Sequence, residues 1–138
     1  MKIGEKKEML CMEECNKQTM HILVKKHESY PLGNETIEGD VLVWRCCECG
    51  EDDLIEDDRD LECKYNRAVK KQKGLLLGEE IKAIREKMHM SIEEFTKFLA
   101  SYGMAQLDEE SYEEIETDYD IQEVEVDEIF RKIAIQDD

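Results

Sequence analysis

The chain has 138 residues, which is room for one ordinary domain or two small ones. Asp and Glu number 36 against 19 Lys and Arg, and the net charge of −17 disfavours nucleic-acid phosphates and favours a basic protein partner. No apolar stretch approaches the roughly 18 residues of a membrane span, and the N-terminus lacks the apolar run of a signal peptide. We therefore expect a cytoplasmic protein without membrane contact, whose cysteines stay reduced.

The first half of the chain is typical of a small β-structure. Short apolar and β-branched runs at 20–24 and 40–45 flank a turn-rich segment at 30–35, which predicts an antiparallel hairpin. The polar residues 50–53 are expected to lead the chain out of the hairpin. From about 58 to 73 the pattern becomes helical and stops at Gly74, a plausible helix C-cap.

Cysteine pairs flank the predicted hairpin on both sides. Cys11 and Cys15 precede it, and a Cys-x-x-Cys formed by Cys46 and Cys49 follows it. Two such turns supply four soft ligands for one tetrahedral zinc ion (Zn2+), and the metal would replace a core that this half is too small to build. Cys47 is an alternative third ligand, although Cys46 is favoured because it completes the two-residue gap.

The remaining candidate residues do not indicate catalysis. Four thiolates leave no open coordination position, so we expect no enzyme. Cys63 falls on the predicted connecting helix and reads as an ordinary buried thiol. The isolated histidines are interpreted as surface or packing residues: His21, His27 and His89. An unrelated group of cytosolic thiols is the other interpretation of the cysteines.

The second half of the chain predicts four short helices. The first lies near 79–88, and a Ser91–Glu94 capping box opens the second. A third lies within 104–117 and a fourth near 124–134. Ile81, Ile84 and Met88 share one face of the first helix, and Phe95, Phe98 and Leu99 of the second are predicted to face inward. The apolar residues of the other two helices are Tyr112, Ile115, Val126, Ile129, Phe130 and Ile133.

Taken together, the cysteine pairs, the hairpin between them, the segment 65–76 and the helix pair at 78–95 resemble the MqsA family of antitoxins. These proteins join a YgiT-type zinc finger to an XRE-type helix-turn-helix. The resemblance covers roughly residues 10–100. It implies zinc and toxin binding in the first domain, dimerisation, which would make this chain a homodimer, and operator recognition through the second.

The chain departs from this family where DNA would be read. The family places polar and basic residues on the third helix, usually before a Tyr-Glu pair, and here either Tyr112-Glu113 or Ile115-Glu116 could take that place. Between Lys97 and Arg131 there are 12 acids and no base, so DNA reading by this helix is disfavoured. A solvated acidic face is one interpretation. The other is a partner-binding surface formed by Glu109, Glu110, Glu113 and Glu114.

The sequence therefore predicts an α+β protein with a zinc-ribbon-like domain at 1–57, a connecting helix and linker at 58–77, and a degenerate helix-turn-helix domain at 78–138. The first hypothesis for its function is an MqsA-like zinc-binding antitoxin or regulator that grips a basic protein. One alternative is an operator-binding repressor that uses cations on the connecting helix: Arg67, Lys70, Lys71 and Lys73. The other is an acidic nucleic-acid mimic that inhibits a host defence enzyme.

Overall fold

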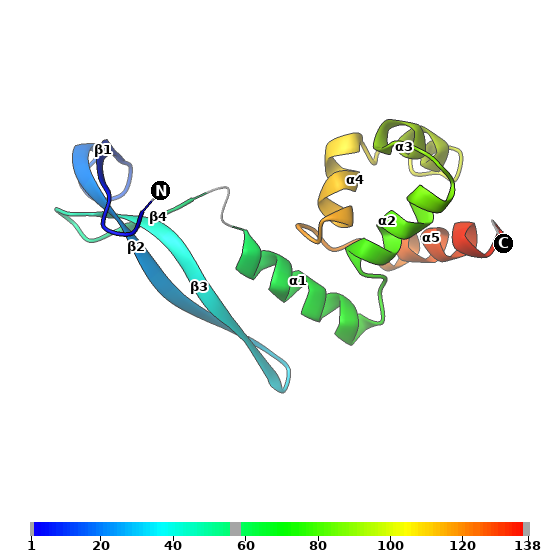
Figure 1. Ribbon diagram of the computed structural model, residues 1–138, viewed down its shortest axis with the longest axis horizontal. Helices are drawn as coiled ribbons and strands as arrows, with labels where there is room; N and C mark the ends of the chain where they lie inside the picture. The colour runs from blue at the N-terminus through cyan, green and yellow to red at the C-terminus, as the bar shows by residue number, and fades with distance from the viewer. Residues whose placement is uncertain (1, 56–58, 137–138) are drawn as a thin grey trace. The chain divides into compact units, whose positions relative to one another are not determined.

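The computed structural model describes residues 2–55 and 59–136 and has an α+β architecture, with four antiparallel strands followed by five helices in that part of the chain (Figure 1). The chain divides into two compact units, Met1–Leu61 and Glu62–Asp138. The predicted boundary between residues 57 and 58 lies outside the described residues. None of the described helices has the length and apolar character that crossing a bilayer requires.

The strands form one sheet in chain order: β1 (Lys6–Cys11), β2 (Lys17–Leu32), β3 (Glu35–Cys46) and β4 (Asp52–Leu54). The predicted hairpin is confirmed as β2 and β3, but both strands are longer than the apolar runs that indicated them. Their turn is only Gly33-Asn34, and Gly33 takes the left-handed backbone (φ 62°) that glycine adopts without strain.

The outer strands β1 and β4 were not predicted from the sequence. In β1 the burial runs from exposed Lys6 to buried Cys11, so no apolar alternation marks it as a strand. The segment 50–53, expected to be polar and without regular structure, overlaps β4, which is three residues long and pairs Val43 with Leu54. Both strands are edge strands, and both are held by backbone pairing to a neighbour rather than by a buried face of their own.

The order of the strands brings the two cysteine turns to the same end of the sheet. One turn joins β1 to β2, and the other joins β3 to β4. Because β2 and β3 are antiparallel, the start of β2 lies beside the end of β3, and His21 is paired with Cys46. The apolar core of this unit is small, and its most deeply buried large side chains include Leu23, Val43 and Trp44.

The second unit holds most of α1 (Asp60–Lys73) together with α2 (Gly78–Lys87), α3 (Ile92–Ala100), α4 (Glu109–Glu116) and α5 (Val124–Gln136). The predicted ends of two helices are confirmed. Gly74 has φ 71°, and Leu75 N–H reaches the Lys70 carbonyl at 2.8 Å, which closes α1 as a Schellman motif. At the start of α3, Ser91 and Glu94 form the reciprocal capping box.

Aromatic rings fill the centre of the helical unit. Phe95 lies 5.4 Å from Tyr112 and 6.5 Å from Phe130 between ring centroids, and all three side chains are fully buried. Most of the apolar residues that marked these helices in the sequence belong to this core. Five of them are only partly buried at its margin: Ile84, Met88, Phe98, Val126 and Ile129.

Not all acids of the 108–128 run face solvent, as a uniform acidic face would require. Glu116, Asp118 and Asp127 are buried, and each carboxylate binds an arginine: Arg85 at 2.8 Å, Arg67 at 2.9 Å and Arg131 at 2.8 Å, respectively. The stretch from Lys97 to Arg131 has no base of its own, so cations from outside it neutralise these three carboxylates. Part of the acidic excess is therefore structural.

Asp118 makes the densest set of these contacts. Its carboxylate accepts hydrogen bonds from Lys70 Nζ at 2.7 Å, Arg67 at 2.9 Å and the Gly78 amide at 2.9 Å, and its carbonyl accepts one from Asn66 at 2.9 Å. The Lys70 side chain is completely buried. Asp118 thus joins α1 to the start of α2 and to the end of α4.

The charge of Asp118 makes the stability of this unit depend on pH. Burial by itself raises the pKa of Asp118, but the hydrogen bonds from Lys70, Gly78 and Arg67 outweigh it and hold the pKa below its usual range. Glu116 and Asp127 also have lowered pKa values, each through an arginine. Their contribution is complete above the ordinary carboxyl pKa of about 4 and is lost as the pH falls through the lower folded values.

We predict that Asp118→Asn lowers the free energy of unfolding of the helical unit by about 3 kcal/mol, because it leaves the buried Lys70 ammonium without its counter-charge. Urea unfolding followed by far-ultraviolet circular dichroism measures this loss. The control is Asp120→Asn, since Asp120 is exposed and its carboxylate accepts a hydrogen bond from the neighbouring Ile121 amide rather than from a buried cation. A loss no larger than that of the control would contradict the prediction.

Candidate metal centre

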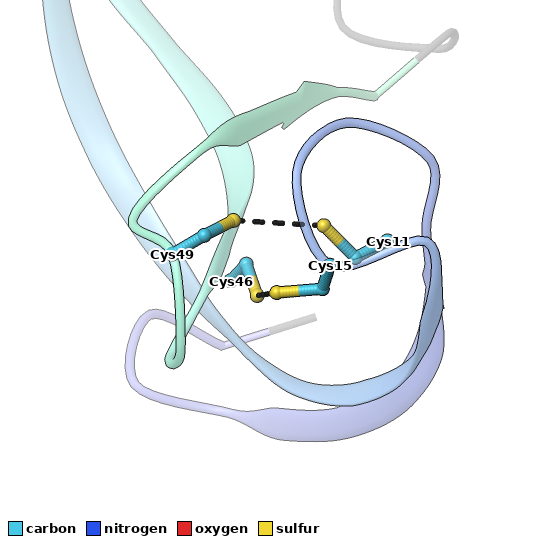
Figure 2. Close-up of side chains that lie close together, drawn as sticks. All are labelled: Cys11, Cys15, Cys46 and Cys49. Carbon is cyan, nitrogen blue, oxygen red and sulfur yellow. Dashed lines mark hydrogen bonds between the residues drawn. The ribbon is translucent and has the colours of Figure 1, made fainter.

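Four cysteine side chains converge at the end of the sheet where its two turns meet (Figure 2). Cys11 and Cys15 come from the β1–β2 turn, and Cys46 and Cys49 come from the β3–β4 turn. Their sulfurs all lie within 4.8 Å of one another. Two of the sulfur pairs join one turn to the other: Cys11 to Cys49 at 3.6 Å and Cys15 to Cys46 at 3.8 Å.

These distances suit a metal ion. A tetrahedral ion with metal–sulfur bonds of about 2.3 Å holds its sulfurs about 3.8 Å apart. All four cysteines are free thiols, and Cys11 and Cys46 are almost completely buried. The number, spacing and burial of the sulfurs therefore fit a closed metal-binding site, in which Cys11, Cys15, Cys46 and Cys49 would hold the ion.

Backbone amides in each turn point at the sulfurs. Cys11 accepts hydrogen bonds from the amides of Cys15 and Glu13, and these amides are the chief reason why its pKa is lowered. Cys46 accepts from the amides of Cys49 and Glu48 in the second turn. Amide donors of this kind stabilise thiolates, the form that binds metal.

The residue after each cysteine pair has a left-handed backbone. Asn16 has φ 50° and Gly50 has φ 79°. Both residue types enter this region readily, and the conformation lets the chain reverse directly into the next strand. In the second turn the reversal is closed by the Gly50 amide, which donates to the Cys46 carbonyl at 2.9 Å. The two turns thus share one local design.

Thr19 is a site residue that the sequence analysis missed. It is buried on β2, and its hydroxyl lies 3.1 Å from the Cys46 sulfur. This hydrogen bond, together with the amides, lowers the pKa of Cys46 to about 6. The sequence holds one hint of this role: Thr19 and His21 are two residues apart, which puts both on one face of a strand. Only the β2–β3 register shows that Cys46 lies on that face.

Cys15 differs from Cys46 in its protonation. Burial, reinforced by the neighbouring thiols, raises the pKa of Cys15 to about 12. A metal ion that binds all four sulfurs must therefore displace a proton from Cys15, so affinity should rise with pH.

The two remaining cysteines lie outside the cluster. Cys47, the alternative third ligand, is exposed, since adjacent residues at the end of a strand point to opposite sides. Its amide bonds the Met20 carbonyl at 2.9 Å. Cys63 is half-buried on α1, and its sulfur lies 3.6 Å from the Thr117 carbonyl oxygen.

His21 is deeply buried beside the cluster, whereas the sequence analysis left open whether it lies at the surface or in the packing. Its Nδ1 bonds the Thr19 carbonyl oxygen at 3.1 Å. His27 lies at the surface, 3.0 Å from Asp40, and that contact is the main cause of its raised pKa. His89 is exposed.

The predicted partner-binding glutamates share the outer side of α4. Glu109, Glu110 and Glu113 are exposed and Glu114 is half-buried, whereas Tyr112 and Ile115 point into the core. Both proposed registers for a family-like Tyr-Glu pair therefore place the apolar member of the pair inside the core. The four glutamates remain a prediction for a partner surface.

In comparisons with known proteins, no protein-family model, no curated protein and no solved structure matches this chain. The resemblance to MqsA antitoxins therefore rests on the residues that suggested it.

We predict that Thr19→Val weakens metal binding by about tenfold, because it removes a hydroxyl donor to a ligand sulfur while keeping the size and branching of the side chain. Competition with a chromogenic chelator measures the affinity. The matched control is Thr36→Val, at an exposed position of β3. Equal affinities for the two variants would contradict the role assigned to Thr19.

Proposed function

We propose that Cys11, Cys15, Cys46 and Cys49 hold one structural zinc ion. The supporting observation is the cluster of four sulfurs contributed equally by two turns. Four thiolates in a tetrahedral arrangement suit zinc or an iron–sulfur centre, and zinc, which has no redox chemistry, suits a site that fastens two turns together. When bound, the ion supplies a cross-link in a unit whose apolar core is small.

We predict one zinc ion per chain in protein purified under reducing conditions, and its loss in Cys46→Ser. Elemental analysis together with circular dichroism of the sheet measures both the metal and the fold. Cys47→Ser is the matched control, because it alters the adjacent, exposed thiol and should keep the full zinc content. Iron in place of zinc, or zinc loss in the control variant alone, would overturn the assignment.

We further propose that the protein is an MqsA-like antitoxin or regulator that acts by binding a basic protein in the cytoplasm. The acidic side of α4 carries this proposal. Glu109, Glu110 and Glu113 are exposed there, and no lysine or arginine occurs between Lys97 and Arg131. Such a surface attracts a cationic partner, accelerates its association and repels phosphate groups.

Operator binding is the second candidate, and the cations on α1 would have to support it. Of the four cations on α1, two form ion pairs with Asp118: Lys70, which is completely buried, and Arg67, at 2.9 Å. Lys71 and Lys73 are exposed in the last turn of α1. Two exposed lysines make few phosphate contacts, so the protein-binding role is favoured.

We predict that changing Glu109, Glu110, Glu113 and Glu114 to Gln abolishes capture of a basic protein partner from the source cell. Affinity purification with identification by mass spectrometry, at low and high salt, measures the capture, which salt should weaken. The matched control changes four acids outside α4 to amides: Asp120, Glu123, Glu125 and Glu128. If both variants lose the partner equally, net charge and not the α4 surface explains the capture. A salt-dependent mobility shift of DNA from the protein's own promoter would favour the repressor.

A further inference from the structure

Two large apolar side chains lie exposed on the outer side of α5. Val124 is 54% exposed at the start of the helix and Ile135 is 73% exposed near its end, whereas Phe130 and Ile133 are buried. With 3.6 residues per turn, Phe130 and Ile133 define the side of the helix that faces the core, and positions 124 and 135 lie on the opposite side. Both apolar side chains are therefore available to another surface.

Two charged residues lie between them and complete a straight stripe. Val124, Glu128, Arg131 and Ile135 follow one another at steps of four, three and four residues, which is the spacing of the a and d positions of a coiled coil. Glu128 and Arg131 are exposed. We call these four residues the α5 stripe. Their spacing suits packing against a second helix along the whole length of α5.

The α5 stripe is complementary to itself when it is read in the opposite direction. Two copies of α5 that lie antiparallel about a two-fold axis place Val124 opposite Ile135 of the second copy, and Glu128 opposite Arg131 of the second copy. Symmetry makes each contact twice, so apolar contacts form at both ends and opposite charges meet at the centre. A parallel pair would instead place each charge beside its own kind, which is repulsive.

Arg131 keeps donors for this contact. Its Nε bonds the Asp127 carboxylate at 2.8 Å, and its Nη2 bonds the Gly74 carbonyl oxygen at 2.8 Å. A guanidinium group has five N–H donors, so others remain for a carboxylate of the second copy. Because the two existing bonds already hold the side chain, less side-chain entropy is lost when it meets that carboxylate.

A second pair of opposite charges lies along one flank of the α5 stripe. Glu125 and Lys132 each directly follow a stripe residue, so both lie on the same flank of the helix. In an antiparallel pair, equivalent flanking positions face each other, so Glu125 meets Lys132 of the second copy.

The outer side of α5 is also balanced in charge. It carries two exposed acids and two exposed bases, in a chain whose net charge is −17: Glu125, Glu128, Arg131 and Lys132. Two chains of that charge repel each other, so they approach most easily where the local charge is neutral. This balance, together with the self-complementary order of the residues, favours a second copy as the occupant.

We propose that α5 is the contact surface of a weak antiparallel homodimer, in which the α5 stripes of two copies pack against each other. α5 has 13 residues and is about 20 Å long, so the contact falls in the class of small interfaces, below about 1,200 Å², whose complexes form only at high concentration. The proposal goes beyond the proposed function and does not depend on it, because neither the cysteine cluster nor the acidic side of α4 takes part.

Sedimentation equilibrium of the full-length chain, under reducing conditions that prevent disulfide links through the exposed Cys47, measures the self-association. We expect a monomer–dimer equilibrium that is evident at protein concentrations up to about 1 mM. A chain that stays monomeric throughout this range would overturn the proposal and leave the α5 stripe to a different partner.

A matched pair of apolar variants locates the contact. Ile135→Ser should weaken the dimer by about tenfold, because the symmetry removes the same apolar contact twice. Leu54→Ser is the control, since Leu54 is 72% exposed but lies on β4 in the sheet unit. Its dissociation constant should stay within about twofold of the original. Equal weakening by the two variants would contradict the proposal.

A charge exchange tests the antiparallel arrangement without a change in net charge. Glu125→Lys and Lys132→Glu should each weaken the dimer by about fivefold, because each places like charges opposite each other. The double variant E125K/K132E makes the charges opposite again and should return the dissociation constant to within about twofold of the original. Such a recovery also excludes misfolding as the cause of the weakening.

Two results of the charge exchange would contradict the arrangement. Glu125→Lys makes the chain less acidic and Lys132→Glu makes it more acidic, so opposite effects of the single variants would mean that net charge alone controls the association. A double variant weaker than either single variant would mean that the two residues do not face each other. Capture of a basic protein is a separate measurement, so a monomeric chain that still captures one would reject the dimer and leave the proposed function intact.

Discussion

The sheet unit depends on the contact between its two turns. β1 and β4 are edge strands at opposite sides of the sheet, and Leu23, Val43 and Trp44 are the main large side chains packed inside it. The cysteine sulfurs of the two turns approach each other to 3.6 and 3.8 Å at one end of the sheet. The β2–β3 register then places Thr19 and His21 beside Cys46.

In the helical unit, buried ion pairs join elements that are far apart in the chain. Asp118 receives two cationic side chains and one backbone amide, and so fixes α1 against the turn into α2 and the end of α4. The aromatic core around Phe95 packs the other helices but does not include α1. Buried ion pairs seldom exceed a well-packed apolar contact in stability, but they penalise incorrect docking strongly because each charge needs its partner.

The acidic excess of the chain thus divides into two chemically different parts. Glu116, Asp118 and Asp127 hold the fold together and consume arginines in doing so. Glu109, Glu110 and Glu113 on α4 are exposed to solvent, as are Glu13, Glu51 and Asp53 in the sheet unit. Arginines that pair with buried acids are not available to balance the exposed acids, so the exposed surface is strongly anionic. Such a surface supports the proposal of a cationic protein partner and disfavours phosphate groups.

The four-cysteine set, the central hairpin, the helices and two of their caps could be predicted from the amino-acid sequence, because they follow from spacing, from left-handed glycine and from side-chain bonds within one turn. Gly74 and the Ser91–Glu94 box are local in this sense. Three features became visible only in the folded chain: β1 and β4 are strands, Thr19 contacts Cys46, and Asp118 is buried against Lys70. The physical reason is that these contacts join residues that are far apart in the chain, and their partners are set by strand register and helix packing, which leave no mark on local composition.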